Sequence, residues 1–163
     1  MKKPTIIKII LIPLILVLIM TACTRGKFFE KYHKFENNTW KRIGDNVWFE
    51  VPVKDTSSLY DLFIAIRHAT FYPYDKISVG ITIYAPSGEM RYSEHNILLK
   101  DDDGKFIAEG LGDIWDIKKP FKEKFSFSNR GIYKFEIENL TGTKYLLPGV
   151  MEVGLIIKKA AKK

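Results

Sequence analysis

Residues 77–84, with the sequence Ile-Ser-Val-Gly-Ile-Thr-Ile-Tyr, decide the fold class. Branched apolar side chains stand at every second position, a period of two that places them on one face of a β-strand and that a helix cannot bury. A turn follows at residues 85–88, and the returning segment carries Met90, Tyr92, Ile97 and Leu99. This stretch therefore predicts one strand of an antiparallel hairpin.

The same alternation recurs along the chain. Tyr133, Phe135 and Ile137 alternate with charged residues, and residues 151–157 have apolar side chains at every second position. Residues 48–51 are also strand-like, and residues 62–66 are apolar on both faces, which is typical of a central strand. We expect an all-β antiparallel sandwich of about eight or nine strands, immunoglobulin-like or jelly-roll-like. Within it, Tyr133 is expected either to form a tyrosine corner with an upstream loop or to be an ordinary core residue.

Composition and charge narrow the function. The chain has 163 residues, 46% of them hydrophobic and 28% charged, as expected for a globular protein of one domain. Its net charge of +7 comes from seven lysines in residues 1–8 and 158–163, and the rest is electrically neutral. We therefore expect no binding to nucleic acid, which requires a clustered cationic surface. The single cysteine, Cys23, excludes an internal disulfide and a multi-cysteine zinc site.

The N-terminus has the pattern of a bacterial lipoprotein signal. Three lysines in residues 1–8 precede fourteen uncharged residues, a run too short to span a bilayer but typical of a secretory signal peptide. The run ends at Met20-Thr21-Ala22-Cys23, which resembles a lipobox. We expect lipidation of Cys23; an ordinary cleaved signal and a signal-anchor helix are the alternatives.

The expected organisation follows from this anchor. Residues 1–22 are the signal peptide, 23–38 the lipidated N-terminus and a flexible tether, 39–158 the sandwich and 159–163 a solvated basic tail. Cys23 is followed by neither an adjacent Asp nor an acidic run. In bacterial lipoproteins that pattern favours the outer membrane, with the domain facing the periplasm.

Several short blocks, taken in order, resemble the GldH family of gliding-motility lipoproteins. They lie at residues 48–51, 55–56, 60–61, 67–68, 72–74, 86–88, 103–105, 110–114, 131–135 and 147–155. Residues 139–142 depart from the family pattern, so no role is transferred there. The resemblance implies a lipid-anchored accessory of the gliding and type IX secretion machinery, with envelope proteins as partners.

A search for catalytic motifs finds no metal-binding, nucleophile or phosphate-loop signature, so neither a metal nor a cofactor is expected. His33, His68 and His95 are far apart in the sequence. Asp101-Asp102-Asp103-Gly104 fits a hairpin turn better than a calcium loop. Glu109, Asp113 and Asp116 are the carboxylates that a hydrolase would use, although scattered surface acids are the simpler interpretation.

The strongest candidate for partner binding is the segment that carries Arg67, His68, Tyr72, Pro73 and Tyr74. An Arg beside aromatic side chains is typical of interface hot spots and also suits stacking on sugars. Gly110, Gly112 and Asp113 are expected beside this segment, with an Arg67–Asp113 ion pair and with Tyr72 and Tyr74 facing outward. In the alternative interpretation, Arg67 is buried against a carboxylate such as Asp61 or Asp113, and the aromatic side chains cap one end of the sandwich.

Three functions remain open. The preferred one is a non-enzymatic component of the envelope machinery that acts through protein contacts. The second is a sandwich that binds glycan or peptidoglycan, which a flat row of exposed Trp or Tyr side chains would favour. The third is a hydrolase, which two carboxylates with perturbed pKa values in a cleft would favour.

Overall fold

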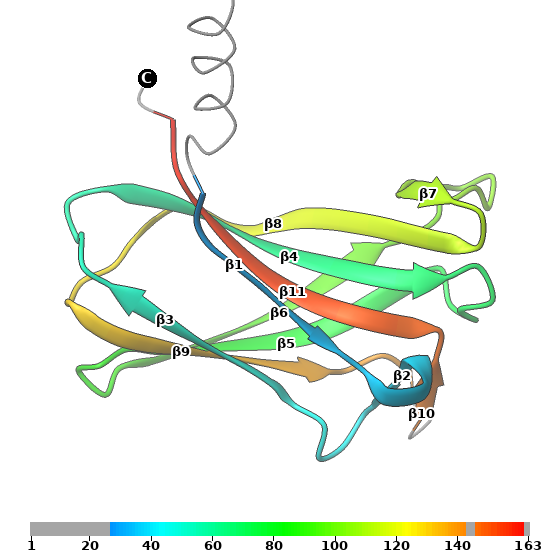
Figure 1. Cartoon of the computed structure of the whole chain (residues 1–163), viewed down its shortest axis with the longest axis horizontal. Coiled ribbons are helices and arrows are strands. Elements are labelled where there is room, and N and C mark those ends of the chain that lie inside the picture. Colours follow the sequence, from blue (N-terminus) through cyan, green and yellow to red (C-terminus); the bar gives the residue numbers. More distant parts are fainter. Residues whose placement is uncertain (1–26, 143–145, 162–163) are drawn as a thin grey trace, which may run out of the picture.

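The chain forms an antiparallel β-sandwich (Figure 1). The computed structural model describes residues 27–142 and 146–161, so the expected lipidation site Cys23 and the signal segment lie outside the described residues. In this part of the chain no helix is long and apolar enough to cross a membrane. The elements are β1 (Lys27–Lys34), η1 (Glu36–Asn38), β2 (Thr39–Lys41), β3 (Val47–Val53), β4 (Leu59–Ala69), β5 (Lys76–Tyr84), β6 (Met90–Leu98), β7 (Glu109–Leu111), β8 (Ile114–Ser126), β9 (Gly131–Asn139), β10 (Leu146–Pro148) and β11 (Val150–Lys159).

The strands form two main sheets. One sheet has the order β1-β11-β4-β8-β7, the other has the order β3-β9-β5-β6, and β2 pairs with β10 beside them. Three of the eleven strands have only three residues. The other eight alternate between the sheets in the strand order of a jelly roll, with only the β5–β6 hairpin remaining in one sheet. The prediction of an antiparallel sandwich is therefore confirmed, and the jelly-roll alternative describes its topology.

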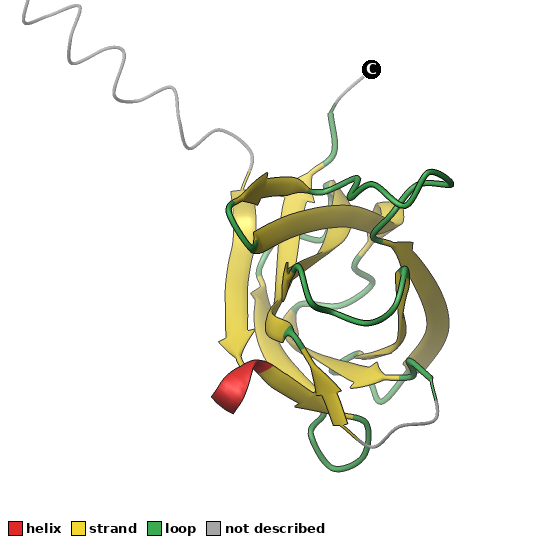
Figure 2. Cartoon of the chain, turned by 90° about the vertical axis from the view of Figure 1, so that its right-hand side faces the viewer, coloured by secondary structure: helices red, strands yellow, loops and turns green. Residues whose placement is uncertain are grey.

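The core lies between the two sheets, which curve around a shared interior (Figure 2). In β3, Val47, Phe49, Val51 and Val53 are buried, and the residues between them are exposed. Strand β4 pairs with β11 on one side and β8 on the other, as expected for a central strand. Burial of one face on each sheet thus produces the alternation seen in the sequence.

The predicted tyrosine corner is present at the start of β9. The hydroxyl of Tyr133 accepts a hydrogen bond from the backbone N–H of Asn129 at 3.1 Å. The ring is buried and packs edge-on against Phe127, with the ring centroids 4.8 Å apart. Tyr133 is thus both a core residue and a clamp on the preceding loop.

The expected boundaries of the sandwich were wrong at both ends. Residues 27–38, expected in the tether, form β1 and η1, and β1 pairs with β11 along the edge of the sheet. Phe35 is buried and stacks on Trp40 at a centroid distance of 5.2 Å, which anchors this segment to the core. At the other end, Lys159 belongs to β11, where it pairs with Tyr60, and is not part of the tail.

Candidate functional site

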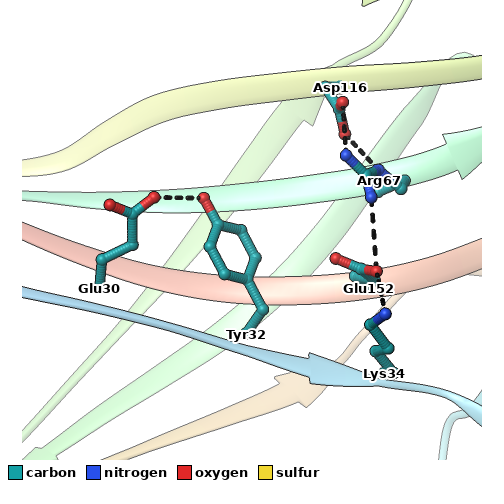
Figure 3. A network of polar contacts seen from close by, with 6 residues as sticks. All are labelled: Glu30, Tyr32, Lys34, Arg67, Asp116 and Glu152. Carbon is teal, nitrogen blue, oxygen red and sulfur yellow. Dashed lines mark hydrogen bonds and ion pairs between the residues drawn. The ribbon is translucent and has the colours of Figure 1, made fainter.

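Four charged side chains of alternating sign cross the outer face of the five-stranded sheet (Figure 3). Lys34, Glu152, Arg67 and Asp116 stand opposite one another on β1, β11, β4 and β8. The Nζ atom of Lys34 lies 3.5 Å from Oε1 of Glu152, and Nη1 of Arg67 lies 3.4 Å from the same oxygen. Arg67 also donates two hydrogen bonds to Asp116, at 2.8 and 2.9 Å. We call these four residues the charge ladder.

A groove of about 610 Å³ lies beside the charge ladder. In the adjacent row of the sheet, Tyr32, Gly154, Ala65 and Lys118 stand opposite one another. Of the two small residues in the middle of that row, Gly154 lets the Tyr32 ring lie close to the sheet and Ala65 lines the groove. Ile107 and Ala108, which precede β7, line the groove as well. The shape of the groove therefore follows from the placement of small residues on the two central strands.

The Tyr32 ring lies directly over Gly154. A Cβ atom at Gly154 would be 2.5 Å from Cδ1 of Tyr32, so only glycine permits this position of the ring. The Tyr32 hydroxyl donates a hydrogen bond to Glu30 at 2.9 Å (Figure 3). Burial of the ring, together with that hydrogen bond, raises the pKa of Tyr32 to about 12. The phenol is therefore protonated at neutral pH and acts as a fixed polar wall of the groove.

The groove carries charges of both signs. Glu30, Glu109 and Glu152 line it together with Lys118, Lys119 and Lys158. The Nζ atoms of Lys118 and Lys158 lie 5.7 and 5.8 Å from the centroid of the Phe63 ring, on the same face of the sheet. Such a surface can form hydrogen bonds and ion pairs with a polar partner, with Tyr32 as its aromatic contact.

The predicted Arg67–Asp113 pair was wrong, although the predicted proximity was right. Asp116 lies directly opposite Arg67 in the β4–β8 register and therefore takes the guanidinium. Asp113 lies in the turn after β7, where its backbone carbonyl accepts the N–H of Thr70 at 2.9 Å. The β7–β8 hairpin still lies beside Arg67, since Arg67, Gly110 and Asp116 line one hollow.

The two predicted glycines have separate structural roles. A Cβ atom at Gly110 would overlap Cε3 of Trp115, so the strand packs directly against the indole ring. Gly112 has a φ of +61°, which the tight turn between β7 and β8 requires. Both residues therefore shape the hairpin, and Gly110 also lines the hollow beside Arg67.

The expected outward rim at His68, Tyr72 and Tyr74 was wrong. His68 and Tyr72 are buried, and Tyr74 is partly buried against the core. The loop turns back because the N–H of Tyr72 donates to the carbonyl of Ala69 at 3.0 Å, which directs the Tyr72 ring inward. Of the five predicted residues in this segment only Pro73 is exposed. The aromatic side chains cap the end of the sandwich, as the alternative interpretation held.

The carboxylates considered for hydrolysis do not share one position. Glu109 and Asp116 face each other in the β7–β8 pair, whereas Asp113 lies in the connecting turn. Both carboxylate oxygens of Asp116 accept hydrogen bonds from Arg67. In the other acidic segment, Oδ1 of Asp101 accepts the N–H groups of Asp103 and Lys105 at 3.1 and 2.8 Å. That carboxylate therefore stabilises a hairpin turn.

The residues of this site that the sequence interpretation missed include Glu30, Tyr32 and Glu152. The first two were placed in the expected tether, because residues 31–34 are all exposed at the sheet edge and show no alternation. Glu152 had a usable signal. In β11, the residues that alternate with the inward-facing apolar positions are Glu152, Gly154, Ile156 and Lys158. The presence of Gly154 and Ile156 on this outward face indicates that the surface there is covered.

The chain is similar to known lipoproteins. A family model described as GldH lipoprotein matches residues 27–157. The chain is 27% identical over 137 residues to "Gliding motility lipoprotein GldH" of Flavobacterium johnsoniae, with 84% of each protein covered. It is 25% identical over 151 residues to "Gliding motility lipoprotein GldH homolog" of Christiangramia forsetii, covering 88% of this chain and 91% of the relative.

A solved structure is similar at a lower level. The structure of AlgX from Pseudomonas aeruginosa is 14% identical to this chain with a TM-score of 0.37, and the match covers 85% of this chain and 27% of that one.

Proposed function

The chain belongs to the GldH lipoprotein family, and from this premise we propose that it is a lipid-anchored, non-enzymatic accessory component of the bacterial gliding-motility and type IX secretion machinery. The observation that carries the proposal is the match of the family model to residues 27–157, which includes nearly all of the sandwich. Two relatives of similar length bear gliding motility in their names.

The proposed anchor is an acylated Cys23. Strand β1 begins at Lys27, four residues later, so the sandwich lies within about 14 Å of the anchor even with the intervening chain fully extended. Lys27 is opposite Lys158 in the β1–β11 pair, which brings Lys158 to the anchored end. We place the protein at the outer membrane with the domain facing the periplasm. The three residues between Cys23 and the first strand leave little freedom for the domain to move away from the bilayer.

Membrane fractionation tests the anchor. Cys23→Ser should leave the protein soluble or unprocessed, because a thioether-linked lipid can no longer form. A matched control is Thr24→Ser, which alters the neighbouring residue and keeps the thiol. Normal membrane fractionation of Cys23→Ser would refute the anchor.

The proposed contact surface for an envelope protein is the groove with its charge ladder. Its polar groups are held in place by neighbours, with Arg67 fixed by Asp116 and Tyr32 fixed by Glu30 and by Gly154. Preformed polar surfaces of this kind lose little conformational entropy on binding. Arg67 donates hydrogen bonds to both oxygens of Asp116. A catalytic acid must exchange a proton at such an oxygen, so this arrangement supports a role in recognition.

A charge reversal at the groove tests this role. Lys118→Glu in the chromosomal gene should abolish colony spreading and remove a crosslinked partner recovered with a cleavable reagent, while protein abundance stays normal. Lys54→Glu is the matched control, because Lys54 is exposed in the loop after β3 and does not line the groove. Normal spreading and normal crosslinking in Lys118→Glu would contradict the proposed surface.

A further inference from the structure

A row of side chains crosses the outer face of the other sheet, far from the groove. The row consists of four residues that stand opposite one another on β3, β9, β5 and β6, namely Trp48, Glu136, Thr82 and Tyr92. The Trp48 and Tyr92 side chains at the two ends of this row are 51% and 50% exposed. Because neighbouring strands are spaced by about 4.8 Å, the row is roughly 14 Å wide. It therefore presents two aromatic side chains over the width expected for an extended ligand.

The aromatic side chain at the β3 end is held together with a carboxylate. Trp48 stacks on Tyr84 with a centroid distance of 5.7 Å and an angle of 24° between the rings. The Tyr84 hydroxyl donates to Glu136 at 2.6 Å, and the Asn46 amide donates to the other oxygen of Glu136 at 2.7 Å. The indole and the carboxylate therefore have defined positions next to each other.

A second carboxylate cluster lies at the β6 end. The Tyr92 hydroxyl donates to Glu94 at 3.0 Å. A Cβ atom at Gly80 would be 2.5 Å from Oε1 of Glu138 and 2.9 Å from the Tyr92 hydroxyl, so glycine lets these two groups converge over the backbone. One row beyond Gly80 and Glu94, Ser78 donates to Asn96 at 2.6 Å. Hydrogen-bonding groups thus surround the second aromatic side chain.

The charge of this face restricts its ligand. Its outward-facing residues include four carboxylates, Glu50, Glu94, Glu136 and Glu138, but only two lysines, Lys76 and Lys134. Lys134 is 3.7 Å from Glu50, so part of that positive charge is already matched. An acceptor-rich, negatively charged surface complements the hydroxyl donors of an uncharged sugar and repels polyanions.

We propose that this face of the β3-β9-β5-β6 sheet binds an uncharged oligosaccharide, with Trp48 and Tyr92 as stacking platforms and Glu94, Glu136 and Glu138 as acceptors for sugar hydroxyls. A protein partner is favoured less, because the exposed aromatic side chains are interleaved with carboxylates and do not form a continuous apolar patch with a polar rim. The site is separate from the groove and does not depend on the proposed role in motility.

Native affinity gels test this proposal on the lipidated protein in detergent. Gels that contain galactan, xylan, mannan or dextran supply uncharged probes, and a polygalacturonate gel supplies an anionic one. We expect retardation in at least one uncharged gel and none in polygalacturonate. Trp48→Ala and Tyr92→Ala should each weaken binding about tenfold, the order expected when an aromatic anchor is truncated. Phe71→Ala is the matched control, since Phe71 is an exposed aromatic side chain in the loop after β4 and lines neither the groove nor this face.

A fluorescence measurement separates a binding role of Trp48 from a structural one. Trp40 is fully buried and Trp115 lies on the other sheet, so a change in emission on addition of the retained polysaccharide should come from Trp48. Trp48→Phe should restore part of the affinity lost in Trp48→Ala and abolish the emission change.

Three results would overturn the proposal. The first is no retardation in any uncharged gel, and the second is an equal loss of binding in Phe71→Ala. The third is binding of a deca-arginine peptide that depends on Trp48 without any retention by polysaccharide, which would assign the face to a basic protein segment. None of these results bears on the Lys118→Glu test, so the two proposals can fail independently.

Discussion

Arg67 binds Asp116 through two of its nitrogen atoms, with Nε 2.8 Å from Oδ1 and Nη2 2.9 Å from Oδ2. The two residues are 49 positions apart in the sequence and meet because they are paired in the β4–β8 register. The fork geometry fixes the guanidinium at the centre of the charge ladder and leaves its third nitrogen, Nη1, facing Glu152 at 3.4 Å. One pair thus orders the three central strands of the candidate site.

The Arg67–Asp116 pair should matter more for function than for stability. Because the two side chains are 39% and 54% exposed, we expect Arg67→Lys to lower the free energy of unfolding by about 1 kcal/mol or less. Lysine cannot form the two-pronged contact, so colony spreading should nevertheless fall strongly. Urea unfolding and spreading assays measure the two effects. Lys54→Ala, in the exposed loop after β3, is the control and should leave both unchanged.

Truncation of Tyr72 should unfold the protein much more readily. Tyr72→Ala removes a buried ring that contacts His68 and Tyr74, so we expect a loss of about 3–5 kcal/mol. Phe71→Ala provides a matched control in the neighbouring residue. The Phe71 side chain is 67% exposed, so its truncation should lower the stability little. Thermal melts of both variants check the difference. Equal melting temperatures of the two variants would show that the Tyr72 ring is not buried.

The strands could be predicted from the sequence because burial on one face produces a local period of two. Residues 77–84 and 131–139 show it clearly, and both lie in strands of the four-stranded sheet. Strand β1 escaped prediction because Lys31, His33 and Lys34 are all exposed at the sheet edge, which leaves no clear alternation to detect.

The site could be predicted only in part, because registers between distant strands have no local signal. Arg67 was identified from its position at a strand end, but its partner depends on which residue of β8 stands opposite it. The composition of residues 71–74 is compatible with aromatic side chains that face either solvent or the core, so it does not distinguish the two. Only the backbone turn from Ala69 to Tyr72 determines which rings are buried.

Stability should fall as the pH decreases below about 6.5 because of His68. Burial lowers the pKa of His68, and its Nε2 atom has no hydrogen-bond partner among the described residues. Below the unfolded pKa of about 6.5, the unfolded chain therefore takes up a proton that the folded chain resists, and folding loses free energy. Above that pH both states are neutral and the effect vanishes.

A pair of histidine variants measures this contribution. Urea unfolding between pH 7.5 and 5.5 should show a weaker pH dependence in His68→Gln than in the unmodified protein. Burial also lowers the pKa of His95, so His95→Gln is the necessary comparison. This variant should retain the part of the pH dependence of stability that is due to His68. An unchanged pH dependence in His68→Gln would show that this ring is free to become protonated in the folded state.

Because Tyr32 and Gly154 are in contact, the effect of Gly154→Ala on the free energy of unfolding should depend on whether the Tyr32 ring is present. Gly154→Ala places a methyl group where the Tyr32 ring lies, 2.5 Å from Cδ1, so the ring must leave its position over the strand. We expect a loss of about 1 kcal/mol, the lower end of the cost of overpacking, because the ring can move toward solvent. In a Tyr32→Ala background the same methyl group meets no ring, and alanine is favoured over glycine in a strand, so Gly154→Ala should then be neutral or stabilising. A double-mutant cycle from urea unfolding measures the difference, and additive effects would show that the ring does not occupy this position in solution.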